Sequence, residues 1–379
     1  MRVLFVAGGS GGVIFAVTPL ALAVRNAGHE VLVATPENTV PTVTSTGLPA
    51  VAATDKTMMD FMFADRLGTP LTLPKDPHER LIFNGRGFGR FAAHSLPALT
   101  QLTEDWRPDV VVGGALSYSA PLIAAKLGVP HVKHAIDMGE PRVLDLAAAA
   151  ELGPELAELG LDDLPRPDLF VDVCPPSLRR ADAADCQPMR YIPVSSQRRI
   201  EPWMYRRGTR PRLLVTAGSR VTKEYDFEVL DGLVRKVSKL DVELLVAAPD
   251  DIATDLGSLP ENVHAGWIPL DVVVRTTDLL VHHAGGNTML TAMANGVPQV
   301  LIPYLPNVVD YADRLSSFGA AKTIQPGADS AEAIVEAATE VVNDLTYRDR
   351  AQEVAAENAA MPTPAEVTGV LEELAATRG

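Results

Sequence analysis

The stretch GWIPLDVVVRTTDLLVHHAGGNTMLTAMANGVPQVLIP, residues 266–303, decides the fold. Within it, Leu279–Val281 is a short apolar run that predicts a buried strand, and the residues from Thr288 onward have helical spacing. The turn from His283 to Thr288 therefore lies where a strand is followed by a helix. Amide groups at a helix start attract phosphate, and glycines let an anion approach the backbone. The stretch therefore predicts a phosphate-binding turn in an α/β domain.

Length and composition predict two such domains. The chain has 379 residues, more than one core usually organises, so two domains of somewhat under about 200 residues each are expected. Hydrophobic residues make up 47% of the chain and aromatic residues only 5%. Together with the dominance of Ala, Val and Leu, this favours helices packed on parallel sheets over a β-sandwich.

Charge and cysteine content exclude several classes of partner and site. The formal net charge of −15 argues against nucleic acid or an anionic membrane as a general partner, so an anion site must be a local pocket. The two cysteines, Cys174 and Cys186, lie outside any Cys-x-x-Cys pattern, so neither a disulfide framework nor a zinc site is expected. The run Met1–Ala7 is too short for a signal sequence, and no long apolar span follows. We expect a cytoplasmic protein, with a homodimer as the assembly to test.

Strand-like and helix-like segments alternate along both halves of the chain, which predicts β-α-β repetition with right-handed crossovers. In the first half these segments are Val3–Ala7, Pro19–Asn26, Val31–Thr35, Val110–Val112, Ala120–Leu127 and Val132–Ile136. In the second half the strands are Arg212–Thr216, Val242–Val246, His264–Trp267, Leu279–His282 and Pro298–Ile302. The basic stretch Gln197–Gly208 between them, which contains a proline and ends in a glycine, marks the predicted linker. The predicted domains are residues 1–196 and 211–362, joined by the linker 197–210 and followed by a helix in 363–379.

Residues 53–90 break the alternation, and we expect an irregular insertion there. The stretch contains Met58–Phe63, a proline-rich tract and the glycine-rich Asn84–Gly89. Long insertions of this kind are usually lids or binding loops. Met and Phe side chains favour an adaptable apolar pocket, and a core helix over Met58–Phe63 is the alternative.

Three motifs in the second half carry a resemblance to a known family. The order Gly-Trp-x-Pro at 266–269, His-x-Gly-x-x-Thr at 283–288 and Gly-Val-Pro at 296–298 resembles the donor motif of family 1 nucleotide-sugar glycosyltransferases of the GT-B fold. The resemblance implies two Rossmann-like parallel-sheet domains facing across a cleft. The first domain would bind the acceptor and the second the nucleotide-sugar donor. The segment Ala365–Ala375 would cross back to the first domain.

The same resemblance assigns roles in the donor site. Trp267 matches the residue that stacks on the nucleobase, and His283 the imidazole that contacts the diphosphate. The turn Thr216–Ser219 resembles the Gly-Ser turn that holds a donor phosphate in other members. The predicted donor-binding residues are Ser219, Trp267, Ile268, His283, Gly285, Asn287 and Thr288.

The amino-terminal glycine loop does not fit a dinucleotide fingerprint. Gly9-Ser10-Gly11 would need a glycine at position 14, where Ile14 stands. This argues against a nicotinamide oxidoreductase, and we interpret the loop as the floor of the cleft. Ser10 is then expected close to the acceptor or the sugar.

Many family members carry a catalytic histidine just after this loop, but residues 12–16 contain none. The strand Val132–Ile136 instead delivers Asp137 at its carboxyl end, where open α/β sheets place ligands. Asp137 is therefore the predicted general base. The alternative is a helix N-cap, because Glu140 follows three residues later as in a capping box.

Three further stretches narrow the resemblance. Residues 108–114, 169–179 and 197–205 are similar to actinobacterial enzymes that attach deoxysugars to aromatic polyketides, of the urdamycin C-glycosyltransferase type. An Asp at the position of Asp137 is the base proposed for that group. Typical hexose-using members have an Asp-Gln pair where this chain has Asn307-Val308, which suggests a sugar with fewer hydroxyls. The predicted acceptor- or sugar-binding residues are Ser10, Met58, Phe61, Met62, Phe83 and Asn307.

The resemblance thus predicts an inverting glycosyltransferase that uses no metal and no cofactor, since its dTDP-deoxyhexose is a co-substrate. The acceptor would be a flat aromatic polyketide and the product a C-glycoside of antibiotic biosynthesis. Three alternatives remain open: an O-glycosyltransferase with the same donor, a silent donor-binding partner that activates another transferase, and a nucleotide-sugar epimerase.

Overall fold

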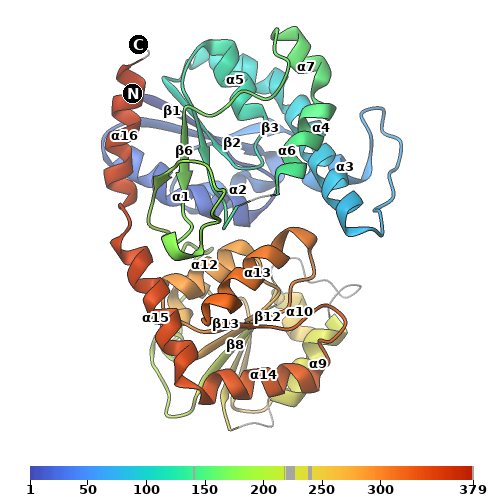
Figure 1. Ribbon diagram of the computed structural model, residues 1–379, viewed down its shortest axis with the longest axis vertical. Coiled ribbons are helices and arrows are strands. Elements are labelled where there is room, and N and C mark those ends of the chain that lie inside the picture. Colours follow the sequence, from blue (N-terminus) through green and yellow to red (C-terminus); the bar gives the residue numbers. More distant parts are fainter. Residues whose placement is uncertain (140, 217, 219–226, 238–240, 378–379) are drawn as a thin grey trace. The chain divides into compact units, whose positions relative to one another are not determined.

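The chain forms two compact units in a computed structural model that describes residues 1–139, 141–216, 218, 227–237 and 241–377. Unit 1 comprises Met1–Cys174, Arg180–Arg190 and Met361–Gly379, and unit 2 comprises Pro175–Arg179 and Tyr191–Ala360 (Figure 1). The predicted linker, residues 197–210, lies within unit 2. The chain thus contributes a short segment, Pro175–Arg179, to unit 2, returns to unit 1, and then forms the rest of unit 2 from Tyr191 to Ala360.

Unit 1 contains a seven-stranded sheet in the order β3-β2-β1-β4-β5-β6-β7, and every neighbouring pair is parallel. Its strands are β1 (Arg2–Val6), β2 (Glu30–Pro36), β3 (Ala50–Thr54), β4 (Val110–Gly114), β5 (His131–His134), β6 (Leu169–Asp172) and β7 (Gln187–Pro188). The central strands β1 and β4 are almost completely buried because helices cover both faces of the sheet. The parallel sheet predicted from the alternation is confirmed.

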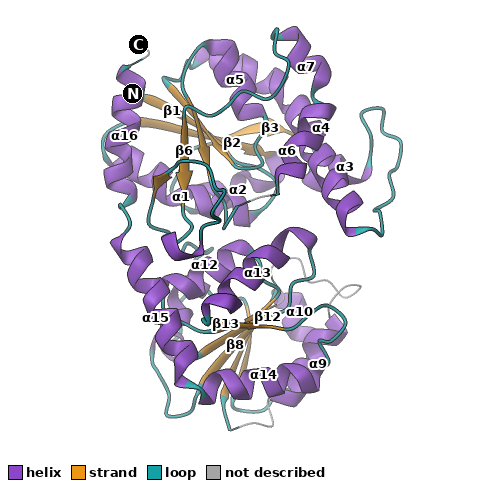
Figure 2. Cartoon of the chain, viewed as in Figure 1, coloured by secondary structure: helices purple, strands orange, loops and turns teal. Residues whose placement is uncertain are grey.

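The helices of unit 1 complete these β-α-β repeats (Figure 2). They are α1 (Gly11–Asn26), α2 (Val40–Ser45), α3 (Met58–Phe63), α4 (Pro77–Asp105), α5 (Ser119–Leu127), α6 (Arg142–Glu151), α7 (Gly153–Glu158) and α16 (Pro364–Ala376), with short 3-10 turns at Glu37–Thr39 and, in unit 2, at Pro176–Leu178. The carboxyl-terminal helix α16 packs against α1, and Nε2 of His29 lies 2.7 Å from Oε1 of Glu372. A capping box at Thr363 and Glu366 fixes where α16 begins.

The prediction of an irregular insertion over residues 53–90 is wrong in most of its length. The glycine-rich stretch lies inside α4, a helix of 29 residues, and residues 58–63 form α3. The glycines serve close packing here: a Cβ on Gly85 would lie 2.6 Å from the Leu144 carbonyl oxygen, and one on Gly89 would lie 2.8 Å from Cβ of Glu151. Because α6 packs directly on this face, tertiary contact outweighs the low helix propensity of glycine.

Unit 2 contains a six-stranded parallel sheet in the order β10-β9-β8-β11-β12-β13. Its strands are β8 (Arg212–Thr216), β9 (Glu243–Ala247), β10 (Val263–Gly266), β11 (Leu279–His282), β12 (Gln299–Leu301) and β13 (Ala321–Thr323). Its helices are α8 (Pro202–Tyr205), α9 (Phe227–Val237), α10 (Asp250–Asp255), α11 (Leu270–Val273), α12 (Gly286–Ala294), α13 (Pro306–Phe318), α14 (Ala331–Asn343) and α15 (Leu345–Ala360), with a 3-10 turn at Val274–Thr276. The five strands predicted for this half of the chain are confirmed to within a residue or two.

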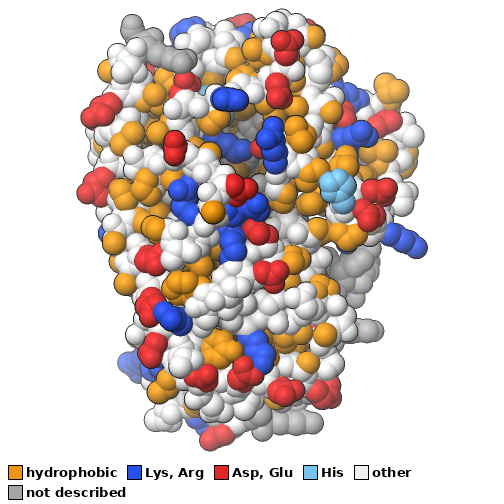
Figure 3. Space-filling view, in the orientation of Figure 1, with side chains coloured by type: hydrophobic (Ala, Val, Ile, Leu, Met, Phe, Trp, Pro, Cys, Tyr) orange, Lys and Arg blue, Asp and Glu red, His pale blue; other side chains and the backbone are white. Residues whose placement is uncertain are grey.

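Each sheet reverses its strand order at one point, between β1 and β4 in unit 1 and between β8 and β11 in unit 2. Ligands of open parallel sheets bind at the carboxyl ends of the strands beside such a point. The loops after β1, β5, β8 and β11 are therefore the places to look for a site. On the molecular face in Figure 3, acidic and basic side chains are interspersed rather than gathered by sign. Within the described ranges, no helix is long and apolar enough to cross a membrane.

Candidate functional site

The predicted strand–turn–helix arrangement at residues 279–294 is confirmed. Strand β11 ends at His282, and α12 begins at Gly286 with Gly285 as its N-cap residue. Between them Ala284 has a φ of 61°, and it is the only non-glycine residue with positive φ among those the structure describes. Such a conformation is strained for alanine and tends to occur at functional turns. The turn therefore aims the first amides of α12 at the carboxyl edge of the sheet.

The imidazole of His283 lies between two glycines in this edge. A Cβ on Gly218, which follows β8, would lie 2.6 Å from Cε1 of His283. A Cβ on Gly285 would come even closer to Nε2 of the same ring. Gly218 also has a φ of +90°, a backbone conformation that residues other than glycine rarely adopt. The backbone on both sides thus fixes the place of the His283 ring next to the start of α12.

The preceding residue, His282, points into the core instead, because successive side chains of a strand alternate between faces. Its Nε2 lies 2.7 Å from Oε1 of Gln299 on β12, and the side-chain amide of Gln299 donates to the Met289 carbonyl in α12. Burial, followed by the neighbouring His283, lowers the pKa of His282 to about 3. His282 is therefore neutral and ties the turn to the helix. His282 is not among the predicted site residues, although its place beside His283 on a buried strand is a signal in the sequence.

Trp267 follows β10 and is held by three contacts within unit 2. Its backbone amide donates to Oδ1 of Asp250 at 3.2 Å, and its indole Nε1 donates to the Ser196 carbonyl at 3.2 Å. The guanidinium of Arg198 lies 5.3 Å from the centre of the indole ring and pairs with Asp250. This hydrogen bond from Arg198 lowers the pKa of Asp250. The ring thus has one face beside a cation and a fixed orientation.

The other predicted donor-site residues are placed as follows. Asn287 and Thr288 lie in the first turn of α12, whereas the side chain of Ile268 is buried in the core beside Leu280 and Ala292. Only the backbone of Ile268 is thus available to a ligand. Asn307 lies in the first turn of α13. Ser219 lies outside the described residues.

In unit 1, Asp137 follows β5 and its side chain is 7% exposed. Its Oδ1 accepts a hydrogen bond from the amide of Gly139 at 3.1 Å. Helix α6 begins five residues later with Pro141 at its N-cap, so Asp137 does not cap it. Glu140, the partner in the alternative capping box, lies outside the described residues. The role of Asp137 as a base stays a prediction.

Two buried histidines precede Asp137 on β5. Burial lowers the pKa of both His131 and His134 to about 4, and Nδ1 of His134 donates to the Ala135 carbonyl at 2.6 Å. Both imidazoles are therefore neutral near pH 7, and both are buried on the strand that leads to Asp137.

Ser10 lies after the carboxyl end of β1, and Met58 packs against the glycine beside it. Ser10 is the N-cap residue of α1, and a Cβ on the adjacent Gly9 would lie 3.0 Å from Cε of Met58. Because β1, β4 and β5 are parallel neighbours, Ser10 and Asp137 follow strands that end at the same edge of the sheet. Part of the predicted acceptor site is thus brought to one edge.

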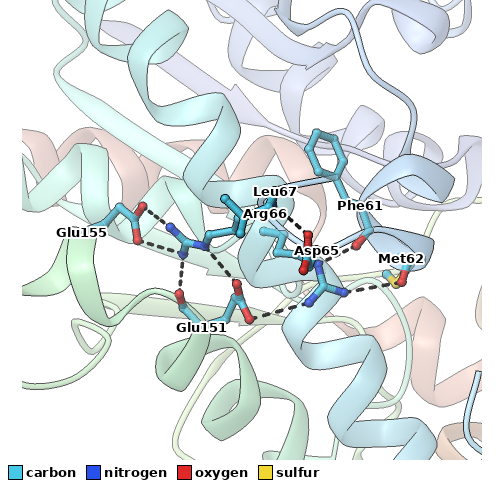
Figure 4. A network of polar contacts seen from close by, with 8 residues as sticks. Phe61, Met62, Asp65, Arg66, Leu67, Glu151 and Glu155 are labelled. Carbon is cyan, nitrogen blue, oxygen red and sulfur yellow. Dashed lines mark hydrogen bonds and ion pairs between the residues drawn. The ribbon is translucent and has the colours of Figure 1, made fainter. Parts of the chain in front are cut away.

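Phe61 and Met62 are buried in the packing of α3 on α4. The ring of Phe61 lies 5.5 Å from that of Phe91, and Met62 packs against Gly87. The buried guanidinium of Arg90 donates to the carbonyl oxygens of both residues (Figure 4). These placements favour the core-helix alternative for Phe61 and Met62. Their role in acceptor binding stays a prediction.

Phe83 lies on the same side of α4, with its ring 5.9 Å from that of Phe63. A cavity of about 710 Å³ opens beside these helices and is lined in part by Met59, Phe61, Phe63 and His94. Arg66 at its wall binds the carboxylates of Glu151 and Glu155 (Figure 4). Arg66 thus ties the segment after α3 to α6 and α7.

The family model described as Erythromycin biosynthesis protein CIII-like, N-terminal domain, matches residues 22–218, and the corresponding C-terminal domain model matches residues 231–374. Among curated relatives, the L-demethylnoviosyl transferase of Streptomyces niveus is 33% identical and the alignment covers 97% of this chain and 96% of that one. The Tylactone mycaminosyltransferase of Streptomyces fradiae is 27% identical, with 99% and 93% covered.

Among solved structures, the glycosyltransferase SsfS6 of Streptomyces sp. SF2575, complexed with thymidine diphosphate, is similar with a TM-score of 0.88. It is 37% identical, and the match covers 98% of this chain and 99% of that one. The spinosyn rhamnosyltransferase SpnG, complexed with spinosyn aglycone, has a TM-score of 0.86 and 27% identity, with 98% and 100% covered. The predicted GT-B architecture of two Rossmann-like parallel-sheet domains is confirmed.

Proposed function

We propose a specific activity for this chain, which belongs to the Erythromycin biosynthesis protein CIII-like family of glycosyltransferases. It transfers a deoxyhexose from a thymidine-diphosphate sugar to an aromatic polyketide and forms a C-glycosidic bond. The observation that carries the donor half of the proposal is the His283 imidazole, held between Gly218 and Gly285 at the start of α12. The likeness to a structure complexed with thymidine diphosphate supports the same ligand class.

The donor would bind along the carboxyl edge of the second sheet. Trp267, whose indole donates to the Ser196 carbonyl and whose backbone amide donates to Asp250, would stack on the thymine. The diphosphate lies against His283 and the first amides of α12, where a helix start stabilises negative charge. Charge grows on the diphosphate as the sugar leaves, so these donors stabilise the transition state more than the ground state.

The acceptor would react at the edge formed by β1 and β5. Asp137 removes the phenolic proton, and the phenolate delocalises its charge onto the ortho carbon. That carbon forms a bond to the anomeric carbon while the bond from the anomeric carbon to the diphosphate oxygen breaks, which inverts the anomeric configuration. Loss of the proton from the substituted ring carbon restores the aromatic ring as a phenolate, and the oxygen then regains a proton from the protonated Asp137 to give the phenol. Thymidine diphosphate is the second product.

The residues around Asp137 support this role. Asp137 is 7% exposed, its carboxylate is oriented by the amide of Gly139, and the buried His134 on the preceding strand is neutral. A carboxylate that must accept a proton during catalysis gains from a site where water is limited and its orientation is fixed. Because residues 12–16 contain no histidine, we assign the role of general base to Asp137.

The test is direct. Purified protein is titrated with thymidine diphosphate by calorimetry and is then incubated with dTDP-deoxysugars and aromatic polyketide acceptors. We expect saturable nucleotide binding and a product whose mass increases by one deoxyhexose residue. The isolated protein should form product without a second protein. Nucleotide binding without product across the whole panel of substrates would favour the alternative of a silent donor-binding partner.

The same experiment separates C-attachment from O-attachment. An O-glycoside is cleaved by warm acid, whereas a C-glycoside survives because its anomeric carbon is bonded to carbon. Recovery of the intact product after acid treatment supports the proposed C-glycosidic bond. Release of the aglycone would replace it with an O-glycosyltransferase that uses the same donor site.

A further inference from the structure

The phenol of Tyr191 is buried against the first turns of α12, the helix that follows the proposed phosphate-binding turn. Its hydroxyl donates to the Asn287 carbonyl at 3.2 Å and lies 3.3 Å from Oγ1 of Thr291. Asn287 and Thr291 are four residues apart, so they lie on one face of the helix. Tyr191 is 5% exposed, and burial raises the pKa of its phenol, which keeps the proton available for donation.

The backbone of Tyr191 is fixed by a second pair of hydrogen bonds. Its amide donates to Oδ1 of Asn358 at 2.9 Å, and Nδ2 of Asn358 donates back to the Tyr191 carbonyl at 3.1 Å. Asn358 is 5% exposed on α15, which itself packs against α12. The phenol therefore cannot move away from α12 without breaking buried hydrogen bonds, each of which leaves a costly unpaired group.

Tyr191 and Asn358 also lie where the chain passes between the units. Tyr191 is the first residue of the longer segment of unit 2, and that segment ends at Ala360, two residues after Asn358. Within unit 1 the adjacent residues are joined as well, since the Arg190 amide donates to the Pro362 carbonyl at 2.7 Å. The two ends of this segment of unit 2, at Tyr191 and near Asn358, are thus hydrogen-bonded to each other, and Tyr191 is hydrogen-bonded to α12.

We propose that Tyr191 is a positioning residue for the donor phosphate, held by Asn358 and acting through the first turn of α12. Asn287 supplies both the carbonyl that Tyr191 binds and, by the proposed function, a group at the phosphate site. A shift of this turn would move the helix-start amides relative to His283. The inference rests on the proposed function, because it names what holds that site in register.

The experiment compares Tyr191→Phe with Tyr118→Phe. Tyr118 is a matched control: it is 4% exposed, its hydroxyl donates to Oδ1 of Asp145 at 2.8 Å, and it lies in unit 1. Both substitutions remove the hydroxyl of a buried tyrosine together with its hydrogen bonding. Affinity for thymidine diphosphate is measured by calorimetry, KM for donor and acceptor by kinetics, and stability by urea denaturation.

We expect Tyr191→Phe to weaken thymidine diphosphate binding about two- to tenfold, which is what one net hydrogen bond contributes. KM for the donor should rise while KM for the acceptor stays unchanged. Tyr118→Phe should leave nucleotide affinity as in the wild type, even where it costs similar stability. Asn358→Ala, which removes the clamp and keeps the phenol, should change nucleotide affinity in the same direction.

The failures are distinguishable. Wild-type protein that binds thymidine diphosphate, with equal affinity in Tyr191→Phe and Asn358→Ala, would overturn the inference and leave the proposed function standing. Equal losses in Tyr191→Phe and Tyr118→Phe would also overturn it, because the effect would then be a general loss of stability. Wild-type protein that does not bind the nucleotide would overturn the proposed function and the inference with it.

Discussion

The imidazole of His283 lies so close to Gly285 that a methyl group on residue 285 would overlap Nε2 of the ring. Gly285 is also the N-cap residue of α12, with extended backbone at φ −62° and ψ 134°. An alanine can adopt that conformation, so the glycine is required by the neighbouring ring rather than by its own backbone. Residue 285 therefore has to lack a Cβ because of the neighbouring His283 ring, whereas its backbone angles impose no such requirement.

Gly285→Ala should therefore weaken thymidine diphosphate binding at least about tenfold, since overpacking of this kind costs about 1–3 kcal/mol and displaces His283. Calorimetric titration measures the affinity. Gly369→Ala is the control, because nothing lies within 4 Å of a Cβ at that position of α16. Nucleotide affinity in Gly285→Ala equal to that of the wild type would remove His283 from the phosphate site.

Asp137→Asn should reduce kcat by about 10²–10⁴-fold, the contribution typical of a general base. The amide side chain keeps the shape of the carboxylate, and Oδ1 can still accept from Gly139, so folding and nucleotide affinity should stay close to those of the wild type. Turnover measured by product mass, together with the nucleotide Kd, tests this. Full activity in the variant would show that another group removes the proton.

Stability should fall as the pH is lowered from about 6.5 toward 4. The pKa of His131 and His134 is lowered to about 4 in the folded chain, and that of His282 to about 3, from an ordinary value of 6.5. Between those values the unfolded chain binds protons that the folded chain does not, so the free energy of unfolding decreases with falling pH. Each histidine contributes about 1.4 kcal/mol per pH unit within this window.

Urea denaturation at pH 7.5, 6.0 and 5.0 measures that slope. His134→Gln should make it shallower for unit 1, because the replacement does not titrate. His78→Gln is the control, since His78 is exposed on α4. If the free energy of unfolding depends on pH equally in His134→Gln and the wild type, the buried imidazole of His134 does not cause the loss of stability at low pH.

Gly85→Ala should destabilise unit 1 by about 1–3 kcal/mol, although alanine favours helices by about 1 kcal/mol over glycine. The new methyl would lie 2.6 Å from the backbone oxygen of Leu144, which cannot rotate away as a side chain would. Gly369→Ala, in open space on α16, should instead be neutral or stabilising. Urea midpoints compare the two, and equal gains in stability would refute close packing of α4 on α6.

Local patterns were sufficient for the elements that propensity and burial both favour. The strand Leu279–His282 and the turn after it follow from an apolar run, glycines and helical spacing, and the structure has them at those residues. The glycine-rich Asn84–Gly89 was misinterpreted as a loop, because low helix propensity is a local signal and the contact with α6 is not. Phe61 and Met62 were ambiguous for the same reason, since an apolar side chain suits a core and a ligand pocket equally.

The sequence by itself determined the two parallel-sheet domains, the strand–turn–helix arrangement at residues 279–294 and the family to which the chain belongs, because these depend on short-range order along the chain. Only the tertiary structure decided which groups hold the turn in place. Gly218, Gln299 and Tyr191 are far from one another in sequence, and all three contact residues within His282–Thr291. Asn358 in turn holds the backbone of Tyr191. No local spacing encodes such a set, since folding alone brings these residues within hydrogen-bonding or van der Waals distance.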